Sequence, residues 1–278
     1  VYSEDIGSVP GTVNQIKLCA QELIEWAKTH GAALFLVGHV TKEGYIAGPK
    51  VVEHMVDTVL YFDSGSGEIR ILHCAKNRFG SVDEIGIFQM QEKGLLQVEN
   101  PASLFLSERT GGEPTGIAVA PVYEGSRILL VEIQSLVVPA KGGVSRVFSE
   151  RIDSARVSRM AAVLEKHLKV RLSDQDIYVN VGGGIRIGEV GVDLSLCLSL
   201  YSARINQPIP SRTAVVGEIS LAGEVRPVGH LDRRIKAVQE LGFTRLISPP
   251  PKEKKPRLPE LCVPVASLAE AARVGFQT

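Results

Sequence analysis

The sequence of 278 residues has few cysteines, few aromatic residues and no net charge. Its four cysteines, Cys19, Cys74, Cys197 and Cys262, are far apart and show none of the paired spacings that bind zinc. We therefore expect buried, reduced thiols, no metal site and a cytoplasmic protein. No signal peptide, twin-arginine leader or long uncharged apolar run is present, which argues against export and membrane insertion.

The sequence also lacks the phosphate-binding loop GxxxxGK[ST] of P-loop ATPases. Gly48-Pro49-Lys50 has neither the upstream glycine nor the hydroxyl that would lie on a metal ion. We therefore do not expect this chain to hydrolyse ATP on its own. Val1 opens a polar stretch, so we read the chain as part of a longer protein.

The bulk composition, with 44% hydrophobic and 22% charged residues, is typical of a globular protein of about two domains. Residues 1–100 carry 8 Lys and Arg against 13 Asp and Glu, whereas residues 101–278 carry 23 against 18. The excess of cations in the second part permits an anionic partner there without requiring one.

Apolar spacing predicts a helix over residues 12–29 and then a strand over the continuous apolar run 32–37. Such a run is typical of a strand buried on both faces of a parallel sheet. The strand ends at His39, and open α/β sheets place ligand-binding groups at strand ends. A packed or loop-capping histidine is the alternative interpretation of His39.

Lys76-Asn77-Arg78-Phe79-Gly80 places two cations and an aromatic ring at the end of a predicted strand over residues 69–75. Arginine offers phosphate a planar fork and lysine a compact charge. The pattern therefore favours phosphate contact, with an ordinary charged hairpin tip as the alternative.

The segment 107–116, SERTGGEPTG, is short, polar and rich in Gly and Thr, and we predict a linker there. Beyond it the pattern predicts a hairpin and then a long helix over residues 149–170. Cations share one face of that helix, and one more borders it: Arg151, Arg159, Lys166 and Lys169, with Arg156 at the border. Lys141 and Arg146 lie in the preceding loop. A phosphate-tracking surface is the functional interpretation, and a solvated face is the alternative.

The string Lys76 to Gly80 resembles the signature of the bacterial RadA (Sms) family of RecA-like recombination ATPases, and residues 39–44, 47–62 and 100–106 resemble the same family in the same order. The resemblance implies an α/β fold in which the distal part of a RecA-like core, residues 1–106, is followed by the linker and by an α+β Lon-protease-like domain, residues 117–278.

For the first part, the resemblance implies that Lys76 and Arg78 reach a nucleotide held by a neighbouring subunit, like an arginine finger. It implies that His39 senses nucleotide and that residues 3–11 and 41–49 face DNA, with Lys42 and Lys50 as DNA-binding cations. ATP and Mg²⁺ would bind the full-length protein, and zinc would bind only upstream of this chain.

For the second part, residues 217–229 resemble the proteolytic domain of Lon, which uses a Ser nucleophile and a Lys base. An ungapped alignment on Gly217 puts Gly191 at the serine position and Asp232 at the lysine position, so we expect no peptidase activity. Ser195, Ser199 and Lys236 lie nearby, and we read the two serines as packing hydroxyls.

Together these features suggest a DNA-dependent, helicase-type ATPase of DNA repair and homologous recombination that promotes branch migration. The expected partners are single-stranded and branched DNA, further copies in a hexameric ring, and a recombinase such as RecA, with no membrane. A pure oligomerisation scaffold and an active Ser-Lys peptidase are the alternatives for the Lon-like domain.

Overall fold

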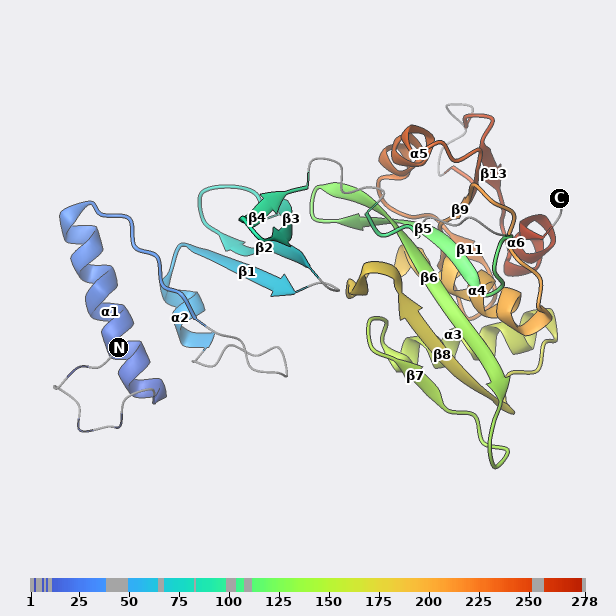
Figure 1. Ribbon diagram of the computed structural model, residues 1–278, viewed down its shortest axis with the longest axis horizontal. Helices are drawn as coiled ribbons and strands as arrows, with labels where there is room; N and C mark the ends of the chain where they lie inside the picture. Colours follow the sequence, from blue (N-terminus) through green and yellow to red (C-terminus); the bar gives the residue numbers. More distant parts are fainter. Residues whose placement is uncertain are drawn as a thin grey trace. The chain divides into compact units, whose positions relative to one another are not determined.

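The computed structural model describes residues 3, 7, 9, 12–38, 50–64, 68–82, 84–98, 104–107, 112–251 and 258–276. The chain divides into two compact units (Figure 1). The N-terminal unit comprises Val1–Phe62 and Leu72–Glu84, and the C-terminal unit comprises Asp63–Ile71 and Ile85–Thr278. Helices and strands are mixed along the chain, which confirms the predicted α/β class.

The N-terminal unit begins with the predicted helix, α1 (Val13–His30), which buries Cys19, Ala20 and Ala27 on one side. Gly31 ends α1 in the left-handed conformation, with φ at 62°, and its N–H donates to the carbonyl of Ala27. The short helix α2 (Lys50–Met55) follows later.

The predicted strand over residues 32–37 is not formed. Phe35 is 86% exposed and Val37 is 92% exposed. A strand buried on both faces needs paired strands beside it and layers above and below, and no described strand pairs with this run. The prediction was wrong because apolar continuity shows what a segment would bury, not whether its partners are present.

Four strands form a sheet in the order β1-β2-β3-β4. They are β1 (Thr58–Ser64), β2 (Ile69–Asn77), β3 (Ile85–Gln91) and β4 (Gly94–Gln97). Within the C-terminal unit, β3 pairs antiparallel with β4, with Phe88 opposite Gln97. Strand β2 lies where the sequence predicts it, and it ends inside the Lys76–Gly80 motif.

The C-terminal unit is built on a seven-stranded mixed sheet in the order β13-β12-β9-β5-β6-β8-β7. Its strands are β5 (Ile117–Glu124), β6 (Arg127–Pro139), β7 (Val147–Ser149), β8 (Gln175–Val181), β9 (Thr213–Val215), β12 (Arg245–Ser248) and β13 (Cys262–Pro264). The predicted hairpin is β5 and β6, which pair antiparallel around Glu124 and Arg127. A separate small ladder joins β10 (Glu218–Ile219) and β11 (Val225–Arg226).

Helices cover the two faces of this sheet. Their bounds are α3 (Ser154–Leu168), α4 (Asp193–Ile205), α5 (Leu231–Glu240) and α6 (Leu268–Gly275). On β6, Leu129, Val131 and Ile133 pack into the cluster that includes α3, α4 and α6, whereas Leu130 packs with α5. We call these sides the α4 face and the α5 face; Figure 1 shows β6 and β8 in front of α3 and α4.

Helix α3 begins at Ser154, five residues later than predicted, because Asp153 acts as its N-cap. The Asp153 carboxylate accepts the N–H of Arg156 at 2.8 Å. Arg151 therefore precedes the helix and does not share its face, so the predicted cation stripe is shorter than expected. Lys169 ends the helix in the left-handed conformation.

The segment 104–107 is held along β6: Phe105 packs with the cluster of the α4 face, and Leu106 packs with that of the α5 face. Phe105 is 3% exposed and makes a parallel bridge with Val131. A Cβ on Gly183, whose φ is 72°, would lie 1.9 Å from Phe105 Cδ1, so this close approach requires glycine. The predicted linker therefore starts from an anchored residue, because Ser107 N–H also donates to Glu132 at 2.9 Å.

Candidate functional site

The Lys76–Gly80 motif forms a turn at the end of β2 that the Asn77 side chain holds in place. Asn77 Oδ1 accepts the N–H of Phe79 at 3.1 Å, and its Nδ2 donates to the carbonyl of Ser81 at 3.2 Å. A Cβ on Gly80 would lie 3.1 Å from that same amide nitrogen. The motif is thus a built turn whose asparagine and glycine both have a geometric reason.

Lys76 is fully engaged at the C-terminal end of α2. Its Nζ donates to the carbonyls of Glu53 at 2.8 Å, His54 at 3.2 Å and Val56 at 2.7 Å. An ammonium has three N–H donors, so these bonds satisfy all of them. They also satisfy carbonyls that have no partner at a helix end, where the helix dipole favours a cation. Lys76 therefore fixes α2 onto β2.

Arg78 is engaged much less firmly. Its N–H donates to the carbonyl of Asp57 at 3.0 Å, and its Nη1 pairs with Asp57 Oδ1 at 3.1 Å. The two side chains are 52% and 45% exposed, and a surface pair of this kind contributes only about 0–1 kcal/mol. Phe79 beside it is 84% exposed. Of the two predicted phosphate contacts, Arg78 is the one that can exchange its partner at little cost.

The surroundings of the motif are rigid. The rings of Tyr61 on β1 and His73 on β2 stack with centroids 5.3 Å apart. Tyr61 Oη also donates to Glu53 Oε1 at 3.1 Å, which ties β1 to α2. Both ends of the Lys76 contact are thereby held by a second set of interactions.

Several predicted residues of the first part cannot be placed. His39, Lys42 and the loop 41–49 lie outside the described residues. Lys50 is the first residue of α2, and its side chain is not described. Their predicted roles stay predictions.

Gly191, which the ungapped alignment puts at the serine position of Lon, lies in a closely packed turn. Gly191 lies in a buried 3₁₀ turn, η3 (Val190–Val192), where a Cβ would come within 2.7 Å of Glu189 Oε1. The cation beside Gly191 is Arg234, which is 1% exposed and pairs with Glu189. Asp232 is exposed on α5. Arg234 is thus the buried cation next to this turn, and Asp232 is not part of the contact.

Arg156 belongs to the same buried network and not to the surface. Its side chain is 9% exposed, and its Nε pairs with Asp193 Oδ1 at 2.7 Å. Its Nη2 donates to the carbonyl of Glu189 at 2.6 Å. Burial raises the pKa of the Asp193 carboxyl, and the Arg156 charge opposes that rise. The prediction that Arg156 borders a DNA-binding stripe is thus wrong, because its guanidinium holds the start of α4.

The alternative peptidase residues are used elsewhere. Ser195 Oγ donates to the carbonyl of Val215 at 2.6 Å, and Ser199 Oγ lies 2.7 Å from Ser135 Oγ. Both serines are fully buried, which confirms them as packing hydroxyls. Lys236 is exposed and pairs with Glu240 at 3.8 Å. Among the described residues no serine and lysine form the contact that a Ser-Lys dyad needs.

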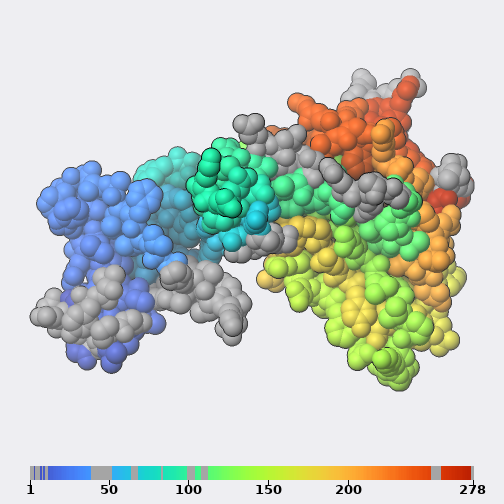
Figure 2. All heavy atoms as spheres, in the orientation of Figure 1, coloured from blue at the N-terminus to red at the C-terminus, as the bar shows by residue number. Residues whose placement is uncertain are grey.

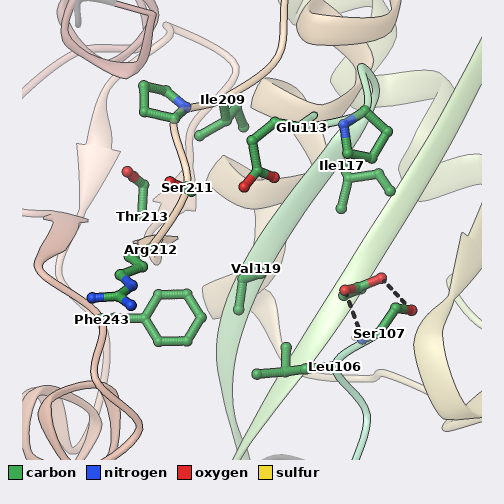
Figure 3. A pocket seen from close by; sticks show the side chains of 13 residues that line it. Leu106, Ser107, Glu113, Ile117, Val119, Ile209, Ser211, Arg212, Thr213 and Phe243 are labelled. Carbon is green, nitrogen blue, oxygen red and sulfur yellow. Dashed lines mark hydrogen bonds between the residues drawn. The ribbon is translucent and has the colours of Figure 1, made fainter. Parts of the chain in front are cut away.

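Hollows lined by described residues lie in the C-terminal unit, and two of them are near the residues discussed above. The first, about 130 Å³, is lined by Leu106, Val119 and Phe243 on its apolar side, and Figure 3 shows Ser107 bonded to the carboxylate of Glu132 at its edge. Ligand pockets measure roughly 300–1,000 Å³, so this hollow is a gap beside the anchored segment. The second, about 660 Å³, lies over the Arg156–Asp193 pair. No group of His, Cys, Asp and Glu suited to a metal ion occurs in the described ranges.

The predicted surface cations of the C-terminal unit fall into two groups. Arg159 and Lys166 are exposed on α3, and Lys169 is exposed at its end. Lys141 is exposed and Arg151 half-buried beside the short strand β7. Arg146 lies there too, but its fork is engaged by Asp176, with Nη2 2.5 Å from Oδ2. The single stripe predicted from helical spacing is therefore divided between α3 and the β7 edge.

Sequence reasoning missed Arg234, Glu189 and Phe105. For Phe105 a signal was present, since it is a large apolar residue next to a polar stretch and polar linkers rarely bury one. No local pattern marks the Arg234–Glu189 pair, because the two residues lie far apart in the chain and meet only in the fold.

Comparison with known proteins agrees with this geometry. Residues 103–268 match the family model of the Lon protease (S16) C-terminal proteolytic domain. The chain is 56% identical over 249 residues to the DNA repair protein RadA of Treponema pallidum, covering 90% of this chain and 55% of the relative. It is 45% identical over 280 residues to the DNA repair protein RadA of Bacillus subtilis, and this match covers 99% of the chain and 61% of the relative.

The chain thus spans between about half and three fifths of the length of these relatives. In the part that the structure describes, no helix has the length and apolar character needed to cross a membrane. The similarity along the chain and the match to the family model agree: the chain belongs to the RadA family of DNA repair proteins, and its residues 103–268 belong to the family of Lon protease C-terminal domains.

Proposed function

We propose that the chain is the distal part of a DNA-dependent ATPase of DNA repair and homologous recombination. The full protein would work as a homo-oligomeric ring, a hexamer by its resemblance to the family, and would promote branch migration on single-stranded and branched DNA with a recombinase such as RecA. Because this chain has no P-loop, ATP and Mg²⁺ would be bound by another part of the longer protein.

The observation that carries the proposal is the unequal engagement of Lys76 and Arg78. Lys76 uses every donor on the end of α2, so it positions the turn. Arg78 has only an exposed pair with Asp57 to give up, and no other guanidinium bond to a described residue is found. A guanidinium that reaches the γ-phosphate from a neighbouring subunit stabilises charge developing on the transferred phosphoryl group. We infer that Arg78 makes this contact and that Lys76 holds it in place.

The C-terminal unit would contribute DNA contact and assembly, not peptide cleavage. Glu189 occupies the space that a side chain on Gly191 would need, and Arg234 pairs with Glu189. The exposed cations Arg159, Lys166 and Lys169 would meet phosphates without reading bases. A pure assembly platform remains the competing role for this unit.

The nucleotide-coupling role is tested by DNA-stimulated ATPase measurements on the full-length protein. Arg78→Ala should lower turnover about a thousandfold, as expected for a lost arginine finger, while light scattering shows the ring retained. Lys93→Ala, an exposed cation in the β3–β4 turn, is the matched control and should behave as wild type. Normal turnover of Arg78→Ala would exclude the role in trans.

The DNA-contact role is tested by the salt dependence of single-stranded DNA binding. Each lost phosphate contact lowers the slope of log K against log salt by about 0.7, so Arg159→Ala should weaken binding and flatten the slope. Lys236→Ala removes an exposed cation that is paired with Glu240, and it serves as control. Unchanged affinity and slope for Arg159→Ala would favour the assembly platform.

A further inference from the structure

Part of the α5 face of the seven-stranded sheet is left uncovered by the described chain. Helix α5 packs over Leu130 on β6, and segment 104–107 covers Glu132 next to it. Beyond Glu132, β6 continues with β8 and β7 to the edge of the sheet. Figure 1 shows no helix in front of this part, and in Figure 2 its yellow-green atoms lie open toward the viewer.

Side chains on this open part form rows across the strands. In the central row Leu136 on β6 lies opposite Tyr178 on β8, which lies opposite Phe148 on β7. They are 56%, 39% and 43% exposed. The neighbours of Tyr178 along β8, Ile177 and Val179, are buried, so the strand period itself directs the ring outward.

The aromatic members of this row are pre-arranged in a stack. The rings of Phe148 and Tyr178 lie 4.7 Å apart at 9°, and the Arg146 guanidinium carbon lies 5.6 Å from the Phe148 centroid. Two bonds from Arg146 to Asp176, one from Nε at 3.2 Å and one from Nη2 at 2.5 Å, fix the plane of that guanidinium. We call Leu136, Tyr178, Phe148 and Arg146 the stacking row.

Cations lie at both ends of β7, around the stacking row. Lys141 precedes the strand, and Arg151 follows it. Arg186 lies beside Arg151, since the N–H of the next residue, Ile187, donates to the carbonyl of Arg151 at 2.9 Å. No hydrogen bond from the side chains of these three cations and no ion pair to a described residue is found. The acid closest to the row, Asp176, is 4% exposed and neutralised by Arg146.

We propose that the stacking row binds the bases of single-stranded nucleic acid, while Lys141, Arg151 and Arg186 hold its phosphates. Exposed aromatic rings and guanidinium planes on a sheet stack with unpaired bases of any sequence, and flanking cations track the backbone. A duplex would not fit, because its bases already stack on each other. The inference rests on the proposed DNA contact of the C-terminal unit and deepens it by separating base from phosphate contacts.

Unpaired cations on both sides of an apolar row favour a polyanion with aromatic rings over a protein partner. A protein interface places a polar rim around its apolar centre, whereas the ion pair that contacts this row, Arg146 with Asp176, is internal to it. The polar row next to it, Gln134 and Asn180, is closed by its own bond at 3.2 Å.

The experiment compares two fluorescent oligomers of about twenty units, one of thymidine and one of abasic sugar-phosphate, bound to the whole chain and followed by anisotropy. Stacking predicts that wild type binds the thymidine oligomer the more tightly. Phe148→Ala and Phe148→Leu should each raise the Kd for thymidine oligomer about tenfold and leave the abasic Kd unchanged. Arg151→Ala should raise both Kd values by the same factor, and Tyr178→Phe should bind as wild type.

Leu96→Ala is the matched control, because Leu96 on β4 is 46% exposed in the same unit and outside the row. Equal wild-type binding of both oligomers, or no effect of both Phe148 variants, would overturn the stacking row while leaving phosphate contact in place. Binding of neither oligomer would overturn the row together with the proposed DNA contact. A changed oligomeric mass of the Phe148 variants, with thymidine binding intact, would identify a protein interface and also overturn it. None of these outcomes bears on the Arg78 experiment.

Discussion

Lys76 and Arg78 are separated by one residue, yet their surroundings give them opposite tasks. The ammonium of Lys76 is compact enough for three carbonyls to converge on it at the end of α2. The wider guanidinium of Arg78 keeps one exposed pair with Asp57. A lysine at position 78 would lose the planar fork, and an arginine at position 76 would not fit the same three acceptors.

We expect Lys76→Met to loosen α2 while preserving the aliphatic stem. A hydrogen bond to a charged group contributes about 1.5–3 kcal/mol, so amide exchange in α2 should accelerate by about ten- to a hundredfold. Arg78→Ala should leave α2 exchange unchanged, because its carboxylate partner, Asp57, lies beyond the helix. Hydrogen exchange read by mass spectrometry separates the two; equal exchange in Lys76→Met and wild type would show that Lys76 is not the anchor.

The Arg146–Asp176 pair predicts a pH dependence of stability. The Arg146 hydrogen bonds hold the pKa of Asp176 below its ordinary value, with a smaller contribution from the charge of Lys141. A carboxyl with a lower pKa in the folded state binds fewer protons there than in the unfolded chain. Its stabilisation is therefore complete above the unfolded pKa, near 4, and is lost as pH falls through the folded value.

Asp176→Asn should accordingly flatten the acid side of the curve of unfolding free energy against pH and lower stability at neutral pH. The measurement is urea unfolding between about pH 3 and pH 7. Asp232→Asn, at an exposed carboxylate without a described ion pair, is the control. If the unfolding free energy of Asp176→Asn fell with decreasing pH as steeply as that of wild type, the lowered pKa of Asp176 would be contradicted.

At the scale of elements, the anchored segment 104–107 makes the start of the predicted linker part of the sheet domain. Phe105 fills the space over Gly182 and Gly183, where side chains would collide with it. Its ring is buried, and its backbone extends the contact through Val131.

Phe105→Ala should lower the free energy of unfolding of the C-terminal unit by about 3–5 kcal/mol, the usual cost of deleting a buried phenylalanine. Phe79→Ala removes the same side chain from an 84% exposed position and should change stability by less than about 0.5 kcal/mol. Denaturant unfolding measures both. A cost for Phe105→Ala as small as that of Phe79→Ala would mean that the segment is not an anchor.

Elements with local signals could be predicted, and those that depend on distant partners could not. Helix α1 has an apolar stripe and a glycine stop, and the hairpin of β5 and β6 has alternation and a turn, so both lie where expected. The run 32–37 has the composition of a buried strand but no described strand beside it. Helix α3 begins five residues later than the spacing predicts, because the Asp153 side chain caps its first turn.

The same division holds for the candidate site. Lys76–Gly80 could be found because its residues are adjacent in sequence, and the missing nucleophile could be inferred from Gly191. The role of Lys76 as an anchor of α2 could not be predicted from the sequence. Its acceptors are backbone carbonyls at least twenty residues away in the chain. Arg156 was assigned to the surface because helical spacing cannot show that Asp193 approaches it from another element.

Across the whole molecule, burial is distributed unequally between the two units. The buried residues of the described N-terminal unit are Gln15, Cys19, Ala20 and Ala27, all on α1. The C-terminal unit buries large side chains such as Leu129, Ile133 and Leu164 completely. Since burial of apolar area supplies most of the free energy of folding, the two units should differ in stability.

Helices α1 and α4 give a direct test of that difference. Helix α1 has 18 residues, of which four are buried, whereas α4 has 13 residues, of which nine are buried. If helix length determined protection from amide exchange, the amides of α1 would exchange more slowly than those of α4. If tertiary packing determines it, the amides of α4 will exchange more slowly. We expect α1 amides to exchange at least about a hundredfold faster than α4 amides in the intact chain, measured by mass spectrometry after peptic digestion. Equal protection of α1 and α4 would mean that the N-terminal unit is stabilised by contacts other than its own core. In that case the intact chain should unfold in a single cooperative transition.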